Sequence, residues 1–318
     1  MNTTIAVVGS LNIDFVAQVE SLPAPGETVL GRDFRMFPGG KGANQACAAG
    51  KLGAERVQVR MVGRVGYDVF ADHLKASLSA AGVDVSFVHA TRSQPTGVAL
   101  IWIDRSGQNS IVVASGANHE LHASEVENFR GAIRGASAAL FQLETPIATV
   151  AAALKMAREE GARTILDPAP AQPLDRALLA MVDLLTPNES EACALLGRPA
   201  GQIGREEAPA AAREVLALGP RAVILKLGGQ GCFYYDGHRE IYSPGFAVEV
   251  KDTTAAGDTF NAALAIALAE ERPVEDALRF ANAAAAISVT RAGAQASAPS
   301  RREVEEFLRQ AIGASGRD

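Results

Sequence analysis

The feature that most constrains the fold of this chain is a regular alternation of short apolar runs with helical patterns. The apolar runs have the length of strands and cover 5–8, 57–62, 139–143, 163–166, 184–186 and 222–227. Helical patterns lie between them, at 42–52, 68–81, 146–160, 175–181, 189–196 and 206–218. Such alternation is typical of a mostly parallel sheet that helices cover on both faces. The sequence therefore predicts an α/β fold with a central, mostly parallel sheet.

The later part of the chain predicts a hairpin followed by helices. Runs at 231–235 and 240–243 flank Asp236-Gly237, a strong hairpin signal. Helical patterns follow at 258–270, 273–289 and 300–312. We find no repeat and no long linker, so we expect residues 1–318 to form a single domain.

Two segments break the alternation. The pattern predicts strands in place of a βα unit within 12–38 and a hairpin over 97–114. In the first arm of that hairpin Val98, Leu100 and Trp102 point one way, while Ala99, Ile101 and Ile103 point the other. The pattern leaves two alternatives: an ordinary central strand with cover on both faces, or a strand that leaves an exposed apolar patch.

Composition narrows the class of protein. The net charge of −6 argues against a nucleic-acid partner. Cys47, Cys193 and Cys232 are odd in number and far apart, which fits reduced thiols in a cytoplasmic protein. No apolar run reaches the ~18 residues of a membrane helix, and we expect no signal peptide.

The segment 252–260, D-T-T-A-A-G-D-T-F, predicts an anion site. Small residues at Ala255, Ala256 and Gly257 let a turn bring its N–H groups close to a ligand, and a helical pattern follows at once. Asp258, in the first turn, could accept a proton from a hydroxyl that attacks a phosphate. An isolated Asp here would more often cap the helix. The A-A-G context and a second glycine motif upstream favour the catalytic interpretation.

The second glycine motif, P-G-G-K-G-A-N-Q at 38–45, is neither of the two commonest nucleotide loops. No Gly lies five positions before Gly40, and Gly42 stands where a P-loop needs Ser or Thr. The first strand ends in Gly9-Ser10-Leu11, which lacks the dinucleotide fingerprint. Any nucleotide must therefore bind in another way.

Two pairs of polar residues have the spacing of binding groups. Asn12 and Asp14 lie on one face of an extended segment, where they could grip adjacent hydroxyls or simply end a strand. Asn188 and Glu191 stand one helical turn apart near the carboxyl end of the sheet. In isolation, Asn188 is more simply interpreted as a helix cap.

Together these motifs resemble the ribokinase-like carbohydrate kinase family. The similar segments appear in the expected order from near residue 5 to near residue 300. They are N-I-D at 12–14, P-G-E-T at 25–28, 39–46, T-G-V-A-L at 96–100, Q-L-E at 142–144, T-P-N-E at 186–189, 252–260 and T-R-A-G-A-Q at 290–295.

The resemblance implies ATP-dependent phosphorylation of D-ribose at its O5 hydroxyl. It implies that Asp258 is the base and that the N–H groups of Ala255, Ala256 and Gly257 form the anion hole. The sugar would be bound by Asn12, Asp14, Gly39, Gly40, Lys41, Asn44, Glu144 and Asp258.

The resemblance also implies sites for ATP and Mg²⁺. Nucleotide and Mg²⁺ would be placed by Asn188, Glu191, Lys226, Gly228, Gly231, Gly257 and Asn282. The chain departs from the family at Lys226, where a Thr is expected, although Lys could contact phosphate as a point charge.

A K⁺ site is implied as well. Asp252 would supply a carboxylate, main-chain carbonyls near Thr254, Ser288, Arg291 and Gly293 would supply oxygens, and Ser297 would add its own.

For the irregular segments, the resemblance implies a small β lid formed by about 12–38 and 97–114. The lid would close over the sugar and pair with the lid of a second subunit, giving a homodimer. Two alternatives remain for function: a kinase acting on 2-deoxyribose, another sugar or a nucleoside, and a non-catalytic sugar-binding protein.

Overall fold

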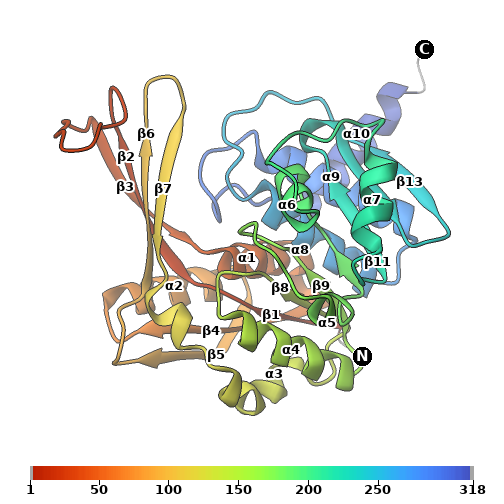
Figure 1. Cartoon of the computed structure of the whole chain (residues 1–318), viewed down its shortest axis with the longest axis horizontal. Coiled ribbons are helices and arrows are strands. Elements are labelled where there is room, and N and C mark those ends of the chain that lie inside the picture. Colours follow the sequence, from red (N-terminus) through yellow and green to blue (C-terminus); the bar gives the residue numbers. More distant parts are fainter. Residues whose placement is uncertain (1–2, 316–318) are drawn as a thin grey trace.

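Two β-sheets organise the molecule (Figure 1). The computed structural model describes residues 3–315, with side chains described as far as residue 311. The larger sheet has the order β13-β12-β11-β10-β9-β8-β1-β4-β5 and is parallel except for the pairs that involve β12 and β13. Its strands are β1 (Thr3–Val8), β4 (Val57–Gly66), β5 (Val83–Thr91), β8 (Ala138–Phe141), β9 (Arg163–Leu166), β10 (Leu184–Leu185), β11 (Ala222–Lys226), β12 (Gly231–Tyr235) and β13 (Glu240–Pro244).

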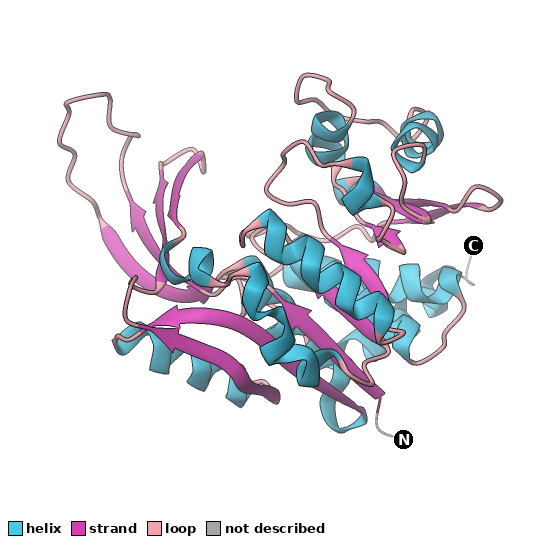
Figure 2. Ribbon diagram, turned by 60° about the horizontal axis from the view of Figure 1, so that its bottom comes forward, coloured by secondary structure: helices cyan, strands magenta, loops and turns pink. Residues whose placement is uncertain are grey.

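Helices cover both faces of the large sheet, as Figure 2 shows. One face packs on α1 (Lys41–Gly53), α2 (Val69–Ala80), α8 (Ala256–Ala269), α9 (Val274–Ser288) and α10 (Arg301–Ser315). The other packs on α3 (Arg130–Ile133), α4 (Ile147–Glu159), α5 (Arg176–Leu179), α6 (Glu189–Leu195) and α7 (Ala208–Leu216). Ile5 and Val7 enter the first core, whereas Ala6 and Val8 enter the second, because side chains of a strand alternate between faces. This explains why the central strands are apolar throughout.

The smaller sheet stands away from one end of the larger one (Figure 1) and is called the lid sheet below. It consists of β2 (Asn12–Gln18), β3 (Asp33–Gly39), β6 (Gly97–Ile103) and β7 (Asn109–Ala114), in the order β3-β2-β6-β7. β6 is internal, yet Leu100 is 40% exposed. Of the two alternatives for this strand, the one that leaves an exposed apolar patch is confirmed.

The predicted fold class is confirmed, with local differences. The sequence missed β5, which lies at the edge of the large sheet and alternates polar with apolar residues instead of forming an apolar run. It also missed the 3₁₀ turns η2 (Gly116–Glu120) and η3 (Ala123–Phe129) and α3, which are too irregular or short to show a helical period. α8 begins at Ala256, two residues before the predicted 258. Among residues 3–315, no helix combines the length and the apolar character that crossing a membrane requires.

Candidate active site

The site lies where the strand order of the large sheet changes direction. β1 pairs with β4 on one side and with β8 on the other, and ligands of open α/β sheets bind at the carboxyl ends of such strands. The segments after these ends touch: the Ser10 hydroxyl donates to Glu144 Oε2, and the same oxygen accepts from the Lys41 backbone N–H at 3.0 Å. The glycine motif at 38–45 is therefore tied to the segment that follows β8.

The glycines at 39–42 allow the start of α1 to lie against the end of β1. A Cβ on Gly42 would stand 2.6 Å from the carbonyl carbon of Gly9, and one on Gly40 would stand 2.7 Å from the Asn12 nitrogen. Gly40 also has φ 88°, a conformation that strongly favours glycine. At Gly39 a Cβ would meet the Asp14 carboxylate at 2.2 Å. Close approach of the backbone is thus built into the motif.

Asn12 and Asp14 lie on the same face of β2, as predicted. Asn12 Oδ1 accepts a hydrogen bond from Asn118 Nδ2 at 2.7 Å, which fixes the orientation of the Asn12 amide. Burial, together with the nearby charges of Glu144 and Asp258, raises the pKa of Asp14 to about 7. The structure therefore brings the predicted sugar-binding residues and Asp258 into one polar cluster.

Asp258 is the third residue of α8 and is 6% exposed. Its Oδ2 accepts from Asn44 Nδ2 at 3.1 Å, and its Oδ1 accepts from Gln45 Nε2 at 3.1 Å. Burial raises the pKa of its carboxyl, while the Lys41 ammonium lowers it. The residue at the N-cap is Ala255, without a side-chain cap, so the interpretation of Asp258 as a capping residue is wrong.

The N-terminus of α8 presents backbone donors beside this carboxylate. Ala255 has φ 59° and ψ 15°, a left-handed conformation that is costly for a residue with a Cβ. The Ala256 N–H donates to Thr253 O at 3.2 Å. Among residues 3–315, the structure gives no protein acceptor for the N–H groups of Ala255 and Gly257. Free donors at the positive end of a helix dipole favour an anion.

Lys41 is the main cation of the polar cluster. Burial lowers the pKa of its ammonium, but the carboxylates of Asp258, Asp167, Glu144 and Glu191 outweigh burial and hold that pKa above its ordinary value. Lys41 therefore stays charged among these carboxylates at neutral pH.

A cavity of about 360 Å³ opens next to the α8 N-terminus. Of the residues predicted to place nucleotide and Mg²⁺, five line it, whereas Asn188 and Glu191 do not; the five are Lys226, Gly228, Gly231, Gly257 and Asn282. The rest of the lining is largely apolar and includes Phe246, Val248, Val250, Ala285, Ala286 and Val289. Asn282 Nδ2 donates to Ser243 O at 3.0 Å and so ties α9 to β13 at the cavity wall. A planar base with a phosphate chain directed at α8 suits this shape and polarity.

Asn188 and Glu191 form a capping box at the start of α6. Asn188 Oδ1 accepts from the Glu191 N–H at 2.8 Å, and Glu191 Oε2 accepts from the Asn188 N–H at 2.7 Å. The cap interpretation is confirmed, and it fixes both side chains beside the end of β11, where Asn188 bridges to Lys226. Burial raises the pKa of Glu191, while Lys226 lowers it.

The residues predicted to surround K⁺ belong to the segment before α8 and to the end of α9 with the loop that follows it, and Asp252 joins the two. Asp252 Oδ1 accepts from the Thr254 N–H and Oδ2 accepts from the Gly293 N–H, both at 2.9 Å. These bonds lower the pKa of Asp252 in spite of its burial. Ser288 and Ser297 are fully buried, and their hydroxyls donate to Ala285 O and Ala294 O.

Sequence reasoning missed four polar residues of the site: Gln45, Asn118, Gln142 and Asp167. Asp167 follows β9 directly, and a polar residue at the carboxyl end of a buried parallel strand is a usable signal. Gln45 and Gln142 are fully buried, which the sequence does not reveal.

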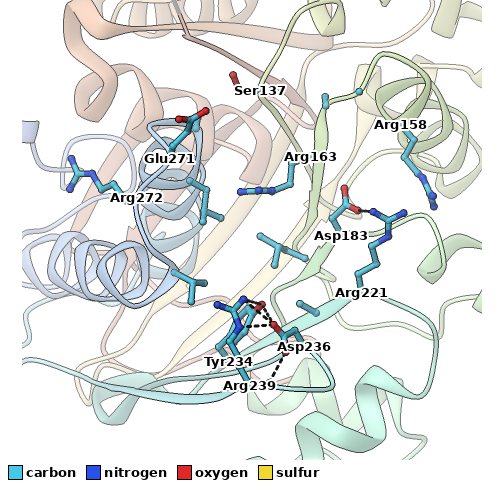
Figure 3. A pocket seen from close by; sticks show the side chains of 17 residues that line it. Ser137, Arg158, Arg163, Asp183, Arg221, Tyr234, Asp236, Arg239, Glu271 and Arg272 are labelled. Atoms are coloured by element: carbon cyan, nitrogen blue, oxygen red, sulfur yellow. Dashed lines mark hydrogen bonds and ion pairs between the residues drawn. The ribbon is translucent and has the colours of Figure 1, made fainter.

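A larger cavity, about 970 Å³, opens at the opposite, amino ends of the strands (Figure 3). Arginines line it, but most of them have protein partners: Arg221 lies 3.1 Å from Asp183, Arg239 lies 2.9 Å from Asp236, and Arg158 donates to Ala180 O. None of its lining residues belongs to the cluster around Asp258. The smaller cavity, at the carboxyl ends, is therefore the candidate active site.

A buried carboxylate beside free helix-terminal donors, with a polar cluster on one side and a base-sized cavity on the other, defines a phosphotransferase acting on a hydroxyl. Residues 2–301 match the model of the pfkB family carbohydrate kinases, and the chain belongs to that family. The chain is 43% identical over 304 residues to the ribokinase of Bacillus subtilis (96% of this chain, 99% of the relative). It is 40% identical over 312 residues to that of Haemophilus influenzae (98% and 100%). The structure of Arabidopsis thaliana ribokinase complexed with ribose and ATP superposes with a TM-score of 0.87 at 34% identity, covering 97% of this chain and 99% of that one.

Proposed function

We propose that this chain transfers the γ-phosphate of ATP to the O5 hydroxyl of D-ribose, giving D-ribose 5-phosphate and ADP. The observation that carries the proposal is the position of Asp258, buried in the first turn of α8 beside the free N–H groups of Ala255 and Gly257. The kinase forms a single domain, and its lid sheet lies over the bound sugar. It acts in the cytoplasm, and its three buried free thiols support a reducing compartment.

The sugar binds between β2, the glycine motif at 39–44 and Glu144. Hydroxyls of a pentose satisfy the polar atoms of Asn12, Asp14 and Asn44; Asn44 Oδ1 is buried without a hydrogen-bond partner in the described part of the chain. An acceptor that lacks one of these hydroxyls leaves a buried group unpaired, which gives the site its selectivity.

Phosphate transfer then depends on positioning and on charge. Asp258 accepts the proton of O5 as that oxygen attacks the γ-phosphate, and a carboxylate with a raised pKa is a better base for this step. The N–H groups of Ala255 and Gly257 hold the charge that develops on the transferred group, with Ala256 shaping the turn between them.

Mg²⁺ fits the edge at Asn188 and Glu191. No three His, Cys, Asp or Glu side chains within residues 3–315 gather into a metal cage. Mg²⁺ usually takes one or two carboxylates plus phosphate oxygens and water, which Glu191 and ATP would supply. The ion would neutralise charge on the transferring phosphate.

K⁺ would order the loop that precedes Asp258. Asp252 already joins the two segments, which supports this proposal. The oxygens would come from Asp252, from main-chain carbonyls near Thr254, Ser288, Arg291 and Gly293, and from the buried Ser297. We expect turnover to fall when K⁺ is replaced by tetramethylammonium, which is too bulky for such a cage. Equal rates in both salts would remove the ion from the mechanism.

The deciding experiment is ADP release from Mg-ATP with ribose, 2-deoxyribose, fructose and adenosine as separate acceptors. We expect ribose to give the highest kcat/KM. A higher value for another acceptor would keep the chemistry and reassign the substrate. Sugar binding without ADP release would instead favour the non-catalytic alternative.

A further inference from the structure

Lys226 and Asp167 form a buried ion pair at the anion site. Lys226 Nζ lies 2.9 Å from Asp167 Oδ1, and the two side chains are 12% and 4% exposed. The same ammonium lies 3.3 Å from the place where a Cβ on Gly257 would stand, against the second residue of α8.

The position of this cation is electrostatically unfavourable without an anion. The N-terminus of α8 carries the positive end of the helix dipole, so a second positive group there is repelled. Asp167 compensates Lys226, but Asp167 Oδ1 faces only one side of the ammonium. Burial lowers the pKa of Lys226, and Asp167 and Glu191 more than restore it, so the group is charged.

Asp167 is linked to Asp258 through one side chain. Gln45 Nε2 donates to Asp167 Oδ2 at 3.2 Å and to Asp258 Oδ1 at 3.1 Å. Gln45 Oε1 accepts from Gln142 Nε2 at 2.6 Å, which leaves the Gln45 amide nitrogen directed at the two carboxylates. A continuous chain therefore runs from the Lys226 ammonium to the carboxylate that acts as the base.

We propose that Lys226 is a fixed cation for the γ-phosphate and that Asp167 is the positioning residue that holds it there and, through Gln45, orients Asp258. The inference rests on the proposed function, in which the phosphate of ATP arrives at the α8 N-terminus. Asp167 supplies the counter-charge in the free enzyme, and the phosphate takes over part of it when ATP binds. Gln45 keeps one oxygen of Asp258 occupied, which directs the other oxygen, shared with Asn44, toward the sugar.

A charge-neutral exchange separates this role from a structural one. We expect Lys226→Met to lower kcat/KM for ATP about 100-fold, the size of effect seen when one donor to a developing charge is removed. Asp167→Asn should lower it about 10-fold, because Lys226 loses its anchor. The double variant should be no better than Lys226→Met, since the phosphate still lacks its cation. If the pair only stabilises the fold, the neutral double variant would recover wild-type turnover, which would overturn the inference.

The pH profile gives a second readout. Asp258 is faced by Lys41 from α1, by Asp14 from β2 and by Asp167 from the end of β9, and Asp167 raises its pKa. The acid limb of kcat/KM should therefore move to lower pH in Asp167→Asn. An unmoved limb would contradict the link through Gln45. Arg221→Met is the matched control, because Arg221 pairs with Asp183 at 3.1 Å at the other end of β11; it should keep wild-type kinetics.

Nucleotide binding separates failure of this inference from failure of the proposed function. Calorimetry with Mg-ATP and Mg-ADP needs no turnover. Lys226→Met should lose at least 10-fold in affinity for ATP and less for ADP. If the wild-type chain phosphorylates no acceptor but shows this pattern, the proposed function fails and the phosphate site stands. If Lys226→Met keeps the wild-type ratio of ATP affinity to ADP affinity, the inference is overturned, even if the wild-type chain phosphorylates ribose.

Discussion

Asp258 is the side chain on which the proposed phosphate transfer depends most. Both of its oxygens accept amide hydrogens, from Asn44 and Gln45. An Asn in its place would keep nearly the same size, but it could not accept a proton, and its amide nitrogen would lose one of these two hydrogen bonds. We expect Asp258→Asn to lower kcat by about 10²–10⁴. The far-ultraviolet circular dichroism and the melting temperature of the variant are its controls. Near-normal turnover would remove Asp258 from its role.

Asp14 should make the free energy of unfolding depend on pH. Its pKa rises to about 7 on folding, from its ordinary value of 3.8, because burial disfavours the charged form. The stability that its protonated form contributes is complete below pH ~4 and is lost as pH rises through 7.

Asp14→Asn should therefore stabilise the free protein at pH 8 and stabilise it less at pH 5, where only part of this contribution has been lost. We expect a gain of about 1–2 kcal/mol at pH 8, after reducing the full shift for solvent screening. Urea unfolding of both proteins at the two pH values measures it. The same difference at both values would show that Asp14 does not titrate in this range.

At the scale of the element, the turn at the start of α8 should depend on the conformation of Ala255. Ala255 at φ 59° is strained, and only a residue without a branched Cβ adopts this conformation at modest cost. We expect Ala255→Gly to retain turnover and Ala255→Val to lower kcat at least 10-fold, because the backbone donors would no longer converge. Steady-state kinetics at saturating ribose and ATP would measure both. Equal kcat values for the two variants would show that the turn does not depend on this conformation.

At the same scale, the sequence predicted elements better than their contacts. β9 has the predicted bounds 163–166, because a buried parallel strand is an unbroken apolar run. The edge strand β5 was missed because one of its faces is partly exposed. The motifs supplied the residues that belong to recognisable local patterns, such as Asn12 and Asp258. Asp167 and Gln45 come from two distant segments and meet only through the sheet order, so no local pattern predicts the contact between them.

At the scale of the whole molecule, the lid sheet leads to a prediction about the oligomeric state. Phe34, Met36, Ile111, Val112 and Val113 are between 45% and 60% exposed on its edge strands β3 and β7. We propose that a second copy of the chain covers this surface, because a monomer would leave a large apolar patch in water.

We expect light scattering to give the mass of a dimer at micromolar concentration. The double variant Ile111→Glu/Val112→Glu should give a monomer, since two buried charges at the interface would repel their symmetry mates. Val69→Glu changes a residue that is 77% exposed outside the lid sheet and should leave the mass unchanged. A monomeric wild-type protein would contradict the proposal.

The hydrogen bond between Asp252 and Gly293 has a consequence for the stage of protein synthesis at which the site can form. The face of β2 that would hold the sugar is encoded within the first 14 residues, yet its partner Asp258 and the loop that Gly293 closes are encoded near the other end. During synthesis, the early half of the sheet therefore leaves the ribosome before the carboxylate that we propose as the base. A nascent chain halted before residue 250 should bind neither ribose nor ATP. The nascent chain would thus bind no substrate through most of its translation and gain activity only in one late step.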